Sequence, residues 1–289
     1  MTPGRTLAAA LGVEWRYDNP LIFPEVWDVA SARMLEAARY PVLTTSASAY
    51  AAAQGYRANE RVDLQELLIV AGRIARDCKA PLIADLEGCF DRSNQYIKRA
   101  TLAALAIGCK GTIIGDGGRD GLQQMLAVAE VANRIKAARI AEMEARKKLF
   151  LIARIDAFHL AAILANPFED AVTRANVYYN AGADLVHVAG IQNPEVVAAL
   201  VAKINAPLLI TVAGTSPPNI AAYRDMGVAG ISLGTGLMRA ALSNMSDQAG
   251  ALLTTGEFAH LSTAMTENEL SKALEPLAQN TIASRFAAR

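Results

Sequence analysis

The sequence has little of what marks several common protein classes. Three cysteines and three histidines in 289 residues indicate neither a disulfide nor a zinc framework, and we expect Cys78, Cys89 and Cys109 to be reduced thiols of a cytoplasmic protein. The 28 basic side chains are balanced by 28 acidic ones and form no block, which argues against nucleic acid and anionic membrane surfaces. No apolar run approaches the ~18 residues of a membrane span, and no signal peptide is recognisable.

The common nucleotide and hydrolase motifs are missing as well. The chain has no GxSxG and no GxxxxGK[ST], and the glycines around Gly115 do not follow the GxGxxG spacing. Only 19% of residues are charged and 53% are hydrophobic, so a disordered chain is excluded. What remains is a soluble globular protein whose chemistry must be sought elsewhere.

Short apolar runs alternate with amphipathic segments along the chain. Each run is largely apolar instead of alternating, as is typical of parallel strands buried on both faces. Eight such strands predict a single-domain (β/α)8 TIM barrel over residues 1–289; the alternative is a doubly wound sheet, which usually has fewer strands. The predicted strands are Leu21–Phe23, Pro41–Thr45, Pro81–Leu86, Gly111–Gly115, Leu149–Ile155, Asp184–Val188, Pro207–Val212 and Gly230–Leu233.

The chain continues for more than fifty residues after the eighth strand. Thr235–Leu242 can form the last barrel helix, and helical patterns follow at Ser246–Leu253 and Glu267–Gln279. A barrel does not need these last helices. We therefore expect residues 243–289 to be a helical extension that covers a surface in its own subunit or in another.

Functional side chains of such a barrel gather where the strands end. Asp85 and Glu87 follow the third strand, and their spacing directs both carboxylates to one side, which suits Mg²⁺; the alternative is a pair of solvated loop acids. Arg154 and Asp156 end the fifth strand. The Arg154 guanidinium can bind two oxygens of a carboxylate or phosphate, and the alternative is a structural contact with Asp156.

Other strand ends carry weaker signals. The hydroxyl and N–H groups of Thr44–Ser48 can hold an anion, or this is an ordinary polar loop. Gly115–Gly118 predicts a flexible or tightly turned loop, a plausible lid hinge. His187 lies within an apolar run, so a hydrogen-bonded core residue is expected, with catalysis as the alternative. Asp28 can cap the helix that contains Ala30–Leu35.

Taken in order, these segments resemble the isocitrate lyase/phosphoenolpyruvate mutase superfamily. The likeness covers roughly residues 8 to 245 and is greatest to short bacterial-type members, which include phosphonopyruvate-processing enzymes, oxaloacetate decarboxylases and 2-methylisocitrate lyases. The matching segments are Pro24–Arg33, Thr45–Ser48 with Gly55-Tyr56, Ala84–Glu87, Ala153–Ala157, Glu169–Ala175, Ala181–Asp184 and Gly227–Gly234.

The resemblance implies a barrel that binds a small carboxylate, an α-keto acid or its enolate, at the strand exits. It assigns Thr45, Ser46 and Ala47 to the substrate carboxylate or enolate and Arg154 to the clamp on the other side, with Arg154 and Ser46 as the predicted catalytic residues.

The resemblance also implies a metal and an assembly. It assigns Asp85 and Glu87 to Mg²⁺, or possibly Mn²⁺, largely through water. Members commonly form homo-oligomers, dimers or tetramers, in which a C-terminal helix packs on a neighbouring barrel.

Two departures from the superfamily pattern remove carboxylates. Where many members have Gly-Tyr-Pro-Asp, this chain has Gly55-Tyr56-Arg57-Ala58, and where they have Glu-Asp it has Gly115-Asp116. The Lys-Lys-Cys-Gly-His loop of the lyases is absent too. We include Asp116 among the predicted metal ligands, with Asp120 as the alternative replacement for the missing acid.

Two functions remain open from the sequence. The first is a Mg²⁺-dependent carbon–carbon lyase or decarboxylase that acts on a small α-keto or 2-hydroxy carboxylate through an enolpyruvate-like intermediate. The second is a catalytically impaired barrel that binds small anions or serves as a scaffold. Retention of Asp85, Glu87 and Arg154 favours the enzyme, whereas Ala58 and Gly115 favour the impaired barrel.

Overall fold

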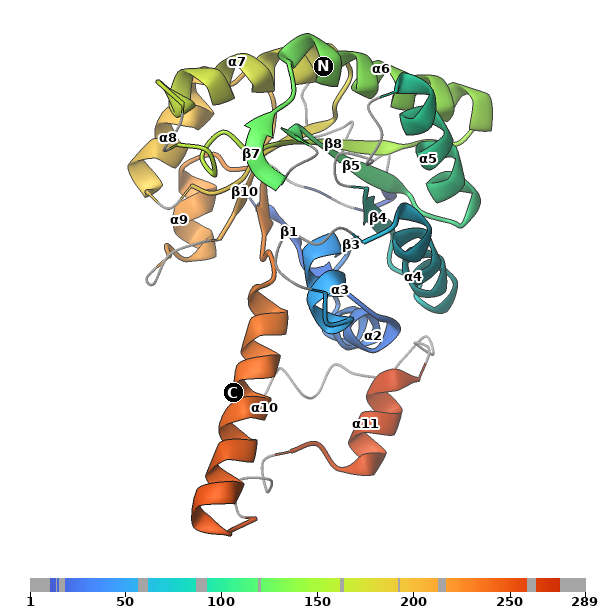
Figure 1. The fold of residues 1–289 in the computed structure, drawn as a ribbon, viewed down its shortest axis with the longest axis vertical. Helices are drawn as coiled ribbons and strands as arrows, with labels where there is room; N and C mark the ends of the chain where they lie inside the picture. The colour runs from blue at the N-terminus through green and yellow to red at the C-terminus, as the bar shows by residue number, and fades with distance from the viewer. Residues whose placement is uncertain are drawn as a thin grey trace.

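The sheet of this protein closes into a ring because its first strand consists of two consecutive pieces, which pair with strands at opposite ends of the sheet (Figure 1). The computed structural model describes residues 11–13, 15, 19–56, 62–86, 93–118, 121–161, 164–191, 193–212, 217–258 and 264–275. The strand order is β1-β11-β10-β9-β8-β5-β4-β3-β2, and all of these pairs are parallel. Because β1 and β2 are consecutive pieces of chain on either side of Pro24, the order forms a ring.

All eight predicted strands are present, and with them the (β/α)8 barrel is confirmed. The first strand is longer than predicted, since β2 continues it beyond Pro24. The barrel strands are β1 (Leu21–Phe23), β2 (Glu25–Val26), β3 (Leu43–Thr45), β4 (Leu82–Asp85), β5 (Gly111–Gly115), β8 (Phe150–Ile155), β9 (Leu185–Val188), β10 (Leu208–Thr211) and β11 (Gly230–Ser232).

Helices surround the ring of strands, and most of them begin at a side chain that caps the first turn. Asp28 accepts the Ser31 N–H at 2.6 Å, which confirms the predicted cap. The helices around the barrel are α2 (Val29–Ala37), α3 (Ala47–Ala53), α4 (Leu64–Asp77), α5 (Asn94–Ala106), α6 (Val128–Ala145), α7 (Pro167–Asn180), α8 (Pro194–Lys203) and α9 (Ile220–Asp225).

One local prediction was wrong, and another is consistent with the structure, which adds detail to it. The segments Thr235–Leu242 and Ser246–Leu253 form one continuous helix, α10 (Gly236–Thr255), because no proline interrupts the residues between them. The glycine-rich loop after β5 contains a short hairpin, in which β6 (Gly117–Gly118) pairs with β7 (Gly121–Met125). Arg119 and Asp120 lie outside the described residues.

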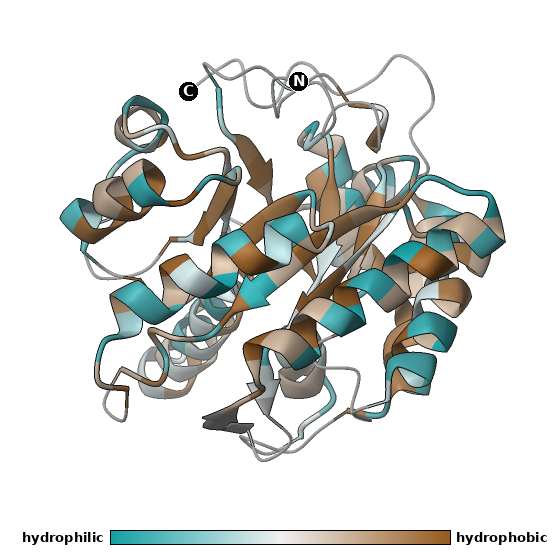
Figure 2. Ribbon diagram, turned by 90° about the horizontal axis from the view of Figure 1, so that it is seen from above, coloured by the Kyte–Doolittle hydropathy of each residue, from teal (hydrophilic) through white to brown (hydrophobic). Residues whose placement is uncertain are grey.

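Two apolar layers hold the barrel together. Outside the strands, the inward faces of the helices pack on the sheet, and Figure 2 shows these brown faces turned toward the brown strands. Inside, a second cluster fills the barrel, with the rings of Phe23 and Phe150 stacked at 6.5 Å between centroids. Leu11, from the segment before the first strand, belongs to this inner cluster. The interior is therefore a packed core, with space for polar groups only at its ends.

The C-terminal extension leaves the barrel as the long helix α10, which points away from it in Figure 1. Met238 is the only residue of α10 that is buried, and Met245 is 63% exposed. Helix α11 (Glu267–Leu274) contacts α2 of the same chain, and Arg33 donates a hydrogen bond to the Leu274 carbonyl. Residues 276–279 of the predicted last helix lie outside the described residues. None of the described helices is long and apolar enough to span a membrane.

The exposed apolar side chains of α10 predict an assembly. Light scattering at micromolar concentration should show a dimer or a tetramer, because side chains such as Met245 and Leu253 are exposed among the described residues and would gain burial against another subunit. Met245→Glu together with Leu253→Glu should shift the protein toward the monomer. Met143→Glu, at an equally exposed position on α6, is the control and should leave the mass unchanged. A wild-type monomer would contradict the prediction.

Candidate active site

The inner face of the barrel changes from apolar to polar toward the carboxyl ends of the strands. Every second residue of a strand points inward, so a residue two positions after a core side chain stands one layer higher. We call this upper layer the barrel mouth. The core residue and the residue above it are Phe23 and Glu25, Ile83 and Asp85, Ile152 and Arg154, Leu185 and His187, and Leu209 and Thr211.

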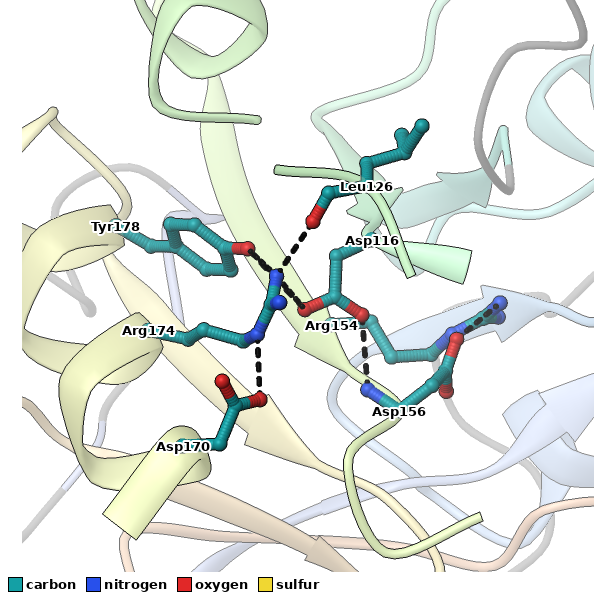
Figure 3. A network of polar contacts seen from close by, with 7 residues as sticks. All are labelled: Asp116, Leu126, Arg154, Asp156, Asp170, Arg174 and Tyr178. Atoms are coloured by element: carbon teal, nitrogen blue, oxygen red, sulfur yellow. Dashed lines mark hydrogen bonds and ion pairs between the residues drawn. The ribbon is translucent and has the colours of Figure 1, made fainter. Parts of the chain in front are cut away.

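Arg154 is the cationic centre of the mouth. Its Nε lies 3.3 Å from Oδ1 of Asp156 and its Nη1 lies 3.6 Å from Oδ2 of Asp85. The pair with Asp156 is visible in Figure 3. The structural contact with Asp156 that the sequence left open is therefore present, but the Arg154 side chain is still 23% exposed. It can contact a ligand while Asp156 holds it.

The position of Arg154 depends on Gly115, its partner on the neighbouring strand β5. A Cβ atom added to Gly115 would lie 3.2 Å from Nη2 and 3.4 Å from Cζ of Arg154. The guanidinium thus occupies the space above a missing side chain. At the position where the superfamily pattern has a glutamate, this chain has Gly115, which leaves space for the Arg154 guanidinium.

The predicted anion-binding residues lie on the other side of Asp85. Thr45 ends β3, and its Oγ1 accepts the Asp85 N–H at 2.8 Å. Ser46 caps α3, since its Oγ accepts the Ala49 N–H at 3.2 Å. Ala47 opens that helix, where the first N–H groups have no carbonyl partner within the helix. The structure therefore places Thr45, Ser46 and Ala47 at the end of β3, next to the strand that carries Asp85. Counting from the inward-facing Val42, the side chain of Ser46 points toward the mouth and that of Thr45 does not.

The predicted metal ligands are only partly described. Asp85 ends β4 and is 8% exposed, within 3.6 Å of Arg154, whereas Glu87 lies outside the described residues. In the described part of the chain, no group of three or more His, Cys, Asp or Glu side chains could hold a metal ion. Such a mouth still fits Mg²⁺, which is commonly held by one or two carboxylates together with waters and substrate.

Asp116 directly follows β5 and lies in a buried network with residues of helix α7 (Figure 3). Its Oδ2 is 3.3 Å from Nη1 of Arg174 and accepts the Tyr178 hydroxyl at 3.1 Å, and its Oδ1 accepts the Asp156 N–H at 2.9 Å. Its role as a metal ligand stays a prediction. The contacts give it a structural role that the sequence did not indicate, because Asp116 joins helix α7 to the strand end that carries Arg154 and Asp156.

The electrostatics of Asp116 follow from this burial. Desolvation, and after it repulsion from Asp156, raises the pKa of Asp116 to about 7, while the Asp156 N–H, Arg174 and Tyr178 oppose the rise. Arg174 also binds Oδ2 of Asp170 at 2.7 Å and the Leu126 carbonyl at 2.8 Å. Each polar group in this network therefore depends on the others to offset its desolvation.

His187 belongs to the same layer as Arg154, its partner in the β8–β9 pairing. Burial, and after it the charge of Arg154, lowers the pKa of His187 to about 3, while the charge of Asp156 opposes the change. Its Nε2 lies 2.7 Å from the hydroxyl of Thr211. The imidazole is therefore neutral and hydrogen-bonded in the core, in agreement with the more conservative of the two interpretations.

Comparison with known proteins identifies the chain's relatives. The family model for phosphoenolpyruvate phosphomutase matches residues 15–253. The chain belongs to the phosphoenolpyruvate mutase/isocitrate lyase superfamily. The match includes every barrel strand and α10 up to residue 253, so the resemblance inferred from the strand exits is confirmed.

Relatives of this superfamily member carry several activities. It is 27% identical over 237 residues to the phosphoenolpyruvate phosphomutase of Streptomyces hygroscopicus, covering 77% of this chain and 72% of that protein. It is 29% identical over 160 residues to the oxaloacetate decarboxylase of Pseudomonas fluorescens, covering 53% and 52%. A solved oxaloacetate acetylhydrolase with its product oxalate superposes with a TM-score of 0.80, at 22% identity and 94% coverage of both chains.

One residue of the mouth in this superfamily member was missed by sequence reasoning. Glu25 follows Pro24 directly, and its Oε1 accepts the Ser232 hydroxyl at 2.7 Å. Burial raises its pKa above the ordinary value; hydrogen bonds from Ser232 and Ser46 and the charge of Arg154 lower it, while Asp85 raises it. The available signal was an acid two residues after the inward-facing Phe23.

The buried network makes a prediction about stability. Asp116→Ala should lower the free energy of unfolding by about 3 kcal/mol or more, because Arg174 loses a partner that is itself completely buried. Urea unfolding measures the change. Asp77→Ala, which removes an exposed ion pair with Arg76, is the control and should leave the unfolding midpoint nearly unchanged. Equal midpoints for the two variants would contradict the assigned role.

Proposed function

We propose that this superfamily member is a Mg²⁺-dependent carbon–carbon lyase or decarboxylase that acts on a small α-keto or 2-hydroxy carboxylate. The observation that carries the proposal is the placement of Arg154 beside Asp85 at the barrel mouth, with Thr45–Ala47 on the other side of Asp85. The cation and the short polar turn can bind the two ends of a small dicarboxylate, and the carboxylate can bind a metal ion between them.

The ligand carboxylate binds between Arg154 and the turn at Thr45–Ala47. The 3.6 Å contact between Arg154 and Asp85 is longer than a hydrogen bond, so a ligand oxygen can replace it without breaking the shorter contact with Asp156. On the other side, the Ala47 N–H at the start of α3 faces the second carboxylate or the enolate oxygen, since the Ser46 N–H is already donated to the Val26 carbonyl at 3.1 Å. Ser46 acts by holding this turn, because its hydroxyl oxygen caps α3.

Asp85 and Glu87 would hold Mg²⁺, or possibly Mn²⁺, through waters. When bound, the metal ion would stabilise negative charge on the enolate oxygen. Asp116 is a less direct candidate for this set than the sequence suggested, since both of its carboxylate oxygens accept hydrogen bonds from protein groups.

Decarboxylation is the reaction that requires the fewest acid and base groups from these residues. In an oxaloacetate-like substrate the bond to the departing carboxylate breaks, CO₂ leaves, and the electron pair forms the pyruvate enolate, which takes a proton from solvent. The residues need only to bind, orient and stabilise charge. The carboxylates missing at Ala58 and Gly115 therefore matter less here than in aldol cleavage. The relationship to oxaloacetate decarboxylases supports this choice.

A second candidate is an impaired barrel that binds small anions or serves as a scaffold. The packing of Arg154 over Gly115 favours it, because a cation occupies space that a metal-directed carboxylate has in the superfamily pattern. An assay of pyruvate release from oxaloacetate with Mg²⁺ separates the two. The enzyme should exceed both the metal-only reaction and Arg154→Ala, whereas a scaffold would bind oxalate and leave the metal-only rate unchanged.

The charge balance of the mouth predicts synergy between metal and ligand. Mg²⁺ alone should bind weakly, because Arg154 competes for Asp85; oxalate should strengthen binding by about tenfold or more as it takes over the guanidinium. Calorimetry with and without oxalate measures both affinities. Tight binding by the free protein that survives Asp85→Ala would show that the metal site lies elsewhere.

Arg154 should decide ligand affinity. A charge-assisted hydrogen bond contributes roughly 1.5–3 kcal/mol, so Arg154→Ala should weaken oxalate binding at least about tenfold. Arg154→Lys keeps the positive charge but cannot donate two parallel hydrogen bonds to one carboxylate. Its oxalate affinity should therefore lie between those of Arg154→Ala and the wild type. Calorimetric titration gives the affinities, and the melting temperature serves as the control for folding. If the folded Arg154→Ala protein binds oxalate with wild-type affinity, Arg154 does not bind the ligand carboxylate.

A further inference from the structure

The strand pairing fixes which inward-facing side chains of the barrel mouth stand at the same height. In a closed barrel the strands are tilted, so paired residues on successive strands drift along the barrel axis by about one residue per strand, and one height takes its side chains from alternate strands. Thr44 pairs with Glu25 on one side and with Ile83 on the other. Asp85 is two residues beyond Ile83 and therefore stands level with Glu25, two strands away.

The same count around the ring completes this level with Arg154 on β8 and Thr211 on β10. The 3.6 Å contact between Arg154 and Asp85 agrees with it. Two acids, one cation and one hydroxyl therefore meet at one height inside the barrel, and they come from the alternate strands β2, β4, β8 and β10.

The two acids of this level differ in their partners. Asp85 has Arg154 beside it, whereas Glu25 forms no ion pair with any cation in the described part of the chain. Oε1 of Glu25 accepts the Ser232 hydroxyl at 2.7 Å. Burial raises the pKa of Glu25, the hydrogen bond from Ser232 opposes the rise, and the charge of Asp85 adds to it. A cation between the two carboxylates would stabilise the charged form of both.

A hydroxyl without a partner lies on the strand between these carboxylates. Thr44 belongs to β3, which separates β2 from β4, and it follows the inward-facing core residue Val42 by two positions. It is 3% exposed, and its Oγ1 has no hydrogen-bond partner among the residues that the structure describes. Buried hydroxyls are nearly always hydrogen-bonded, because an unpaired one has lost its contact with water without replacement. The Thr44 oxygen therefore indicates a bound group on the side of the mouth between Glu25 and Asp85.

We propose that Glu25, Thr44 and Asp85 form a site for a divalent cation, with two carboxylates as charged ligands and the Thr44 hydroxyl as a neutral one, each directly or through a water. All three offer oxygen, the donor that Mg²⁺ and Mn²⁺ prefer. The site deepens the proposed function, on which it rests for the presence of a metal ion, and extends the metal ligands from the end of β4 across β3 to β2. Its position rests on the strand pairing and the unpaired hydroxyl, neither of which depends on the reaction.

Titration of the full chain with Mn²⁺, followed by the electron paramagnetic resonance signal of the free ion, measures the site without substrate. Glu25→Gln keeps the shape and one acceptor but loses the charge, and should weaken Mn²⁺ binding about tenfold. Glu66→Gln is the control. Glu66 also accepts hydroxyls, from Tyr56 at 2.8 Å and Tyr50 at 3.4 Å, but it lies on α4, outside the ring of strands. The Mn²⁺ affinity of Glu66→Gln should equal that of the wild type.

Two threonines separate a metal ligand from a hydroxyl that is merely buried. Thr112 is completely buried and its Oγ1 is also unpaired in the described structure, but its strand partners Ala84 and Leu151 belong to the outer apolar layer, so it faces the helices. Thr44→Val and Thr112→Val should both raise the urea midpoint or leave it unchanged, because each replaces an unpaired hydroxyl with a methyl group. Only Thr44→Val should weaken Mn²⁺ binding, by about threefold.

The site and the proposed function can fail separately. Wild-type Mn²⁺ affinity in a folded Glu25→Gln or in Thr44→Val would overturn the site, as would a wild-type protein that binds no Mn²⁺. If Glu25→Gln does not fold, the Thr44→Val titration decides. Mn²⁺ binding that depends on both residues, in a protein that releases no pyruvate from oxaloacetate above the metal-only rate, would refute the function and support the site. Pyruvate release above that rate, with Mn²⁺ affinity unchanged in both variants, would do the opposite.

Discussion

Every second residue of a closed strand ring has to face inward, and the chemistry of this protein depends on that constraint. The lower inward positions are apolar and pack around Phe23 and Phe150. The positions one layer higher are forced into the same confined space, so Asp85, Arg154 and Glu25 meet although they are far apart in the sequence. No loop has to bring them together, and the rigid sheet sets their spacing.

Much of the fold could be predicted from the sequence, and the reasons are local. Largely apolar runs such as Phe150–Ile155 are typical of strands buried on both faces, and the position of Arg154 follows from its place near the end of one of them. Glu25 was missed because the motif around it is dominated by Trp27 and Asp28. The network of Asp116 could not be predicted, since Arg174 and Tyr178 lie 58 and 62 residues away on a helix whose rotation the sequence does not specify.

Gly115 and Arg154 show how one missing side chain changes a site. Their strands are neighbours in register, and the Arg154 guanidinium lies where a side chain on Gly115 would begin. The arginine lies within reach of Asp85 and is held by Asp156, which is linked through Asp116 to Arg174. Its positive charge offsets the acidic side chains of the mouth, which favours ligands with at least one carboxylate over a bare cation.

The split first strand also has a consequence during synthesis. Its two pieces find their partners at very different times, because β2 pairs with β3 nearby whereas 207 residues separate Glu25 from Ser232. Until the last strand leaves the ribosome, β1 and β10 are open edges that can pair with other chains. The nascent protein thus carries its greatest risk of aggregation late, and ring closure is a step of high loop-closure entropy.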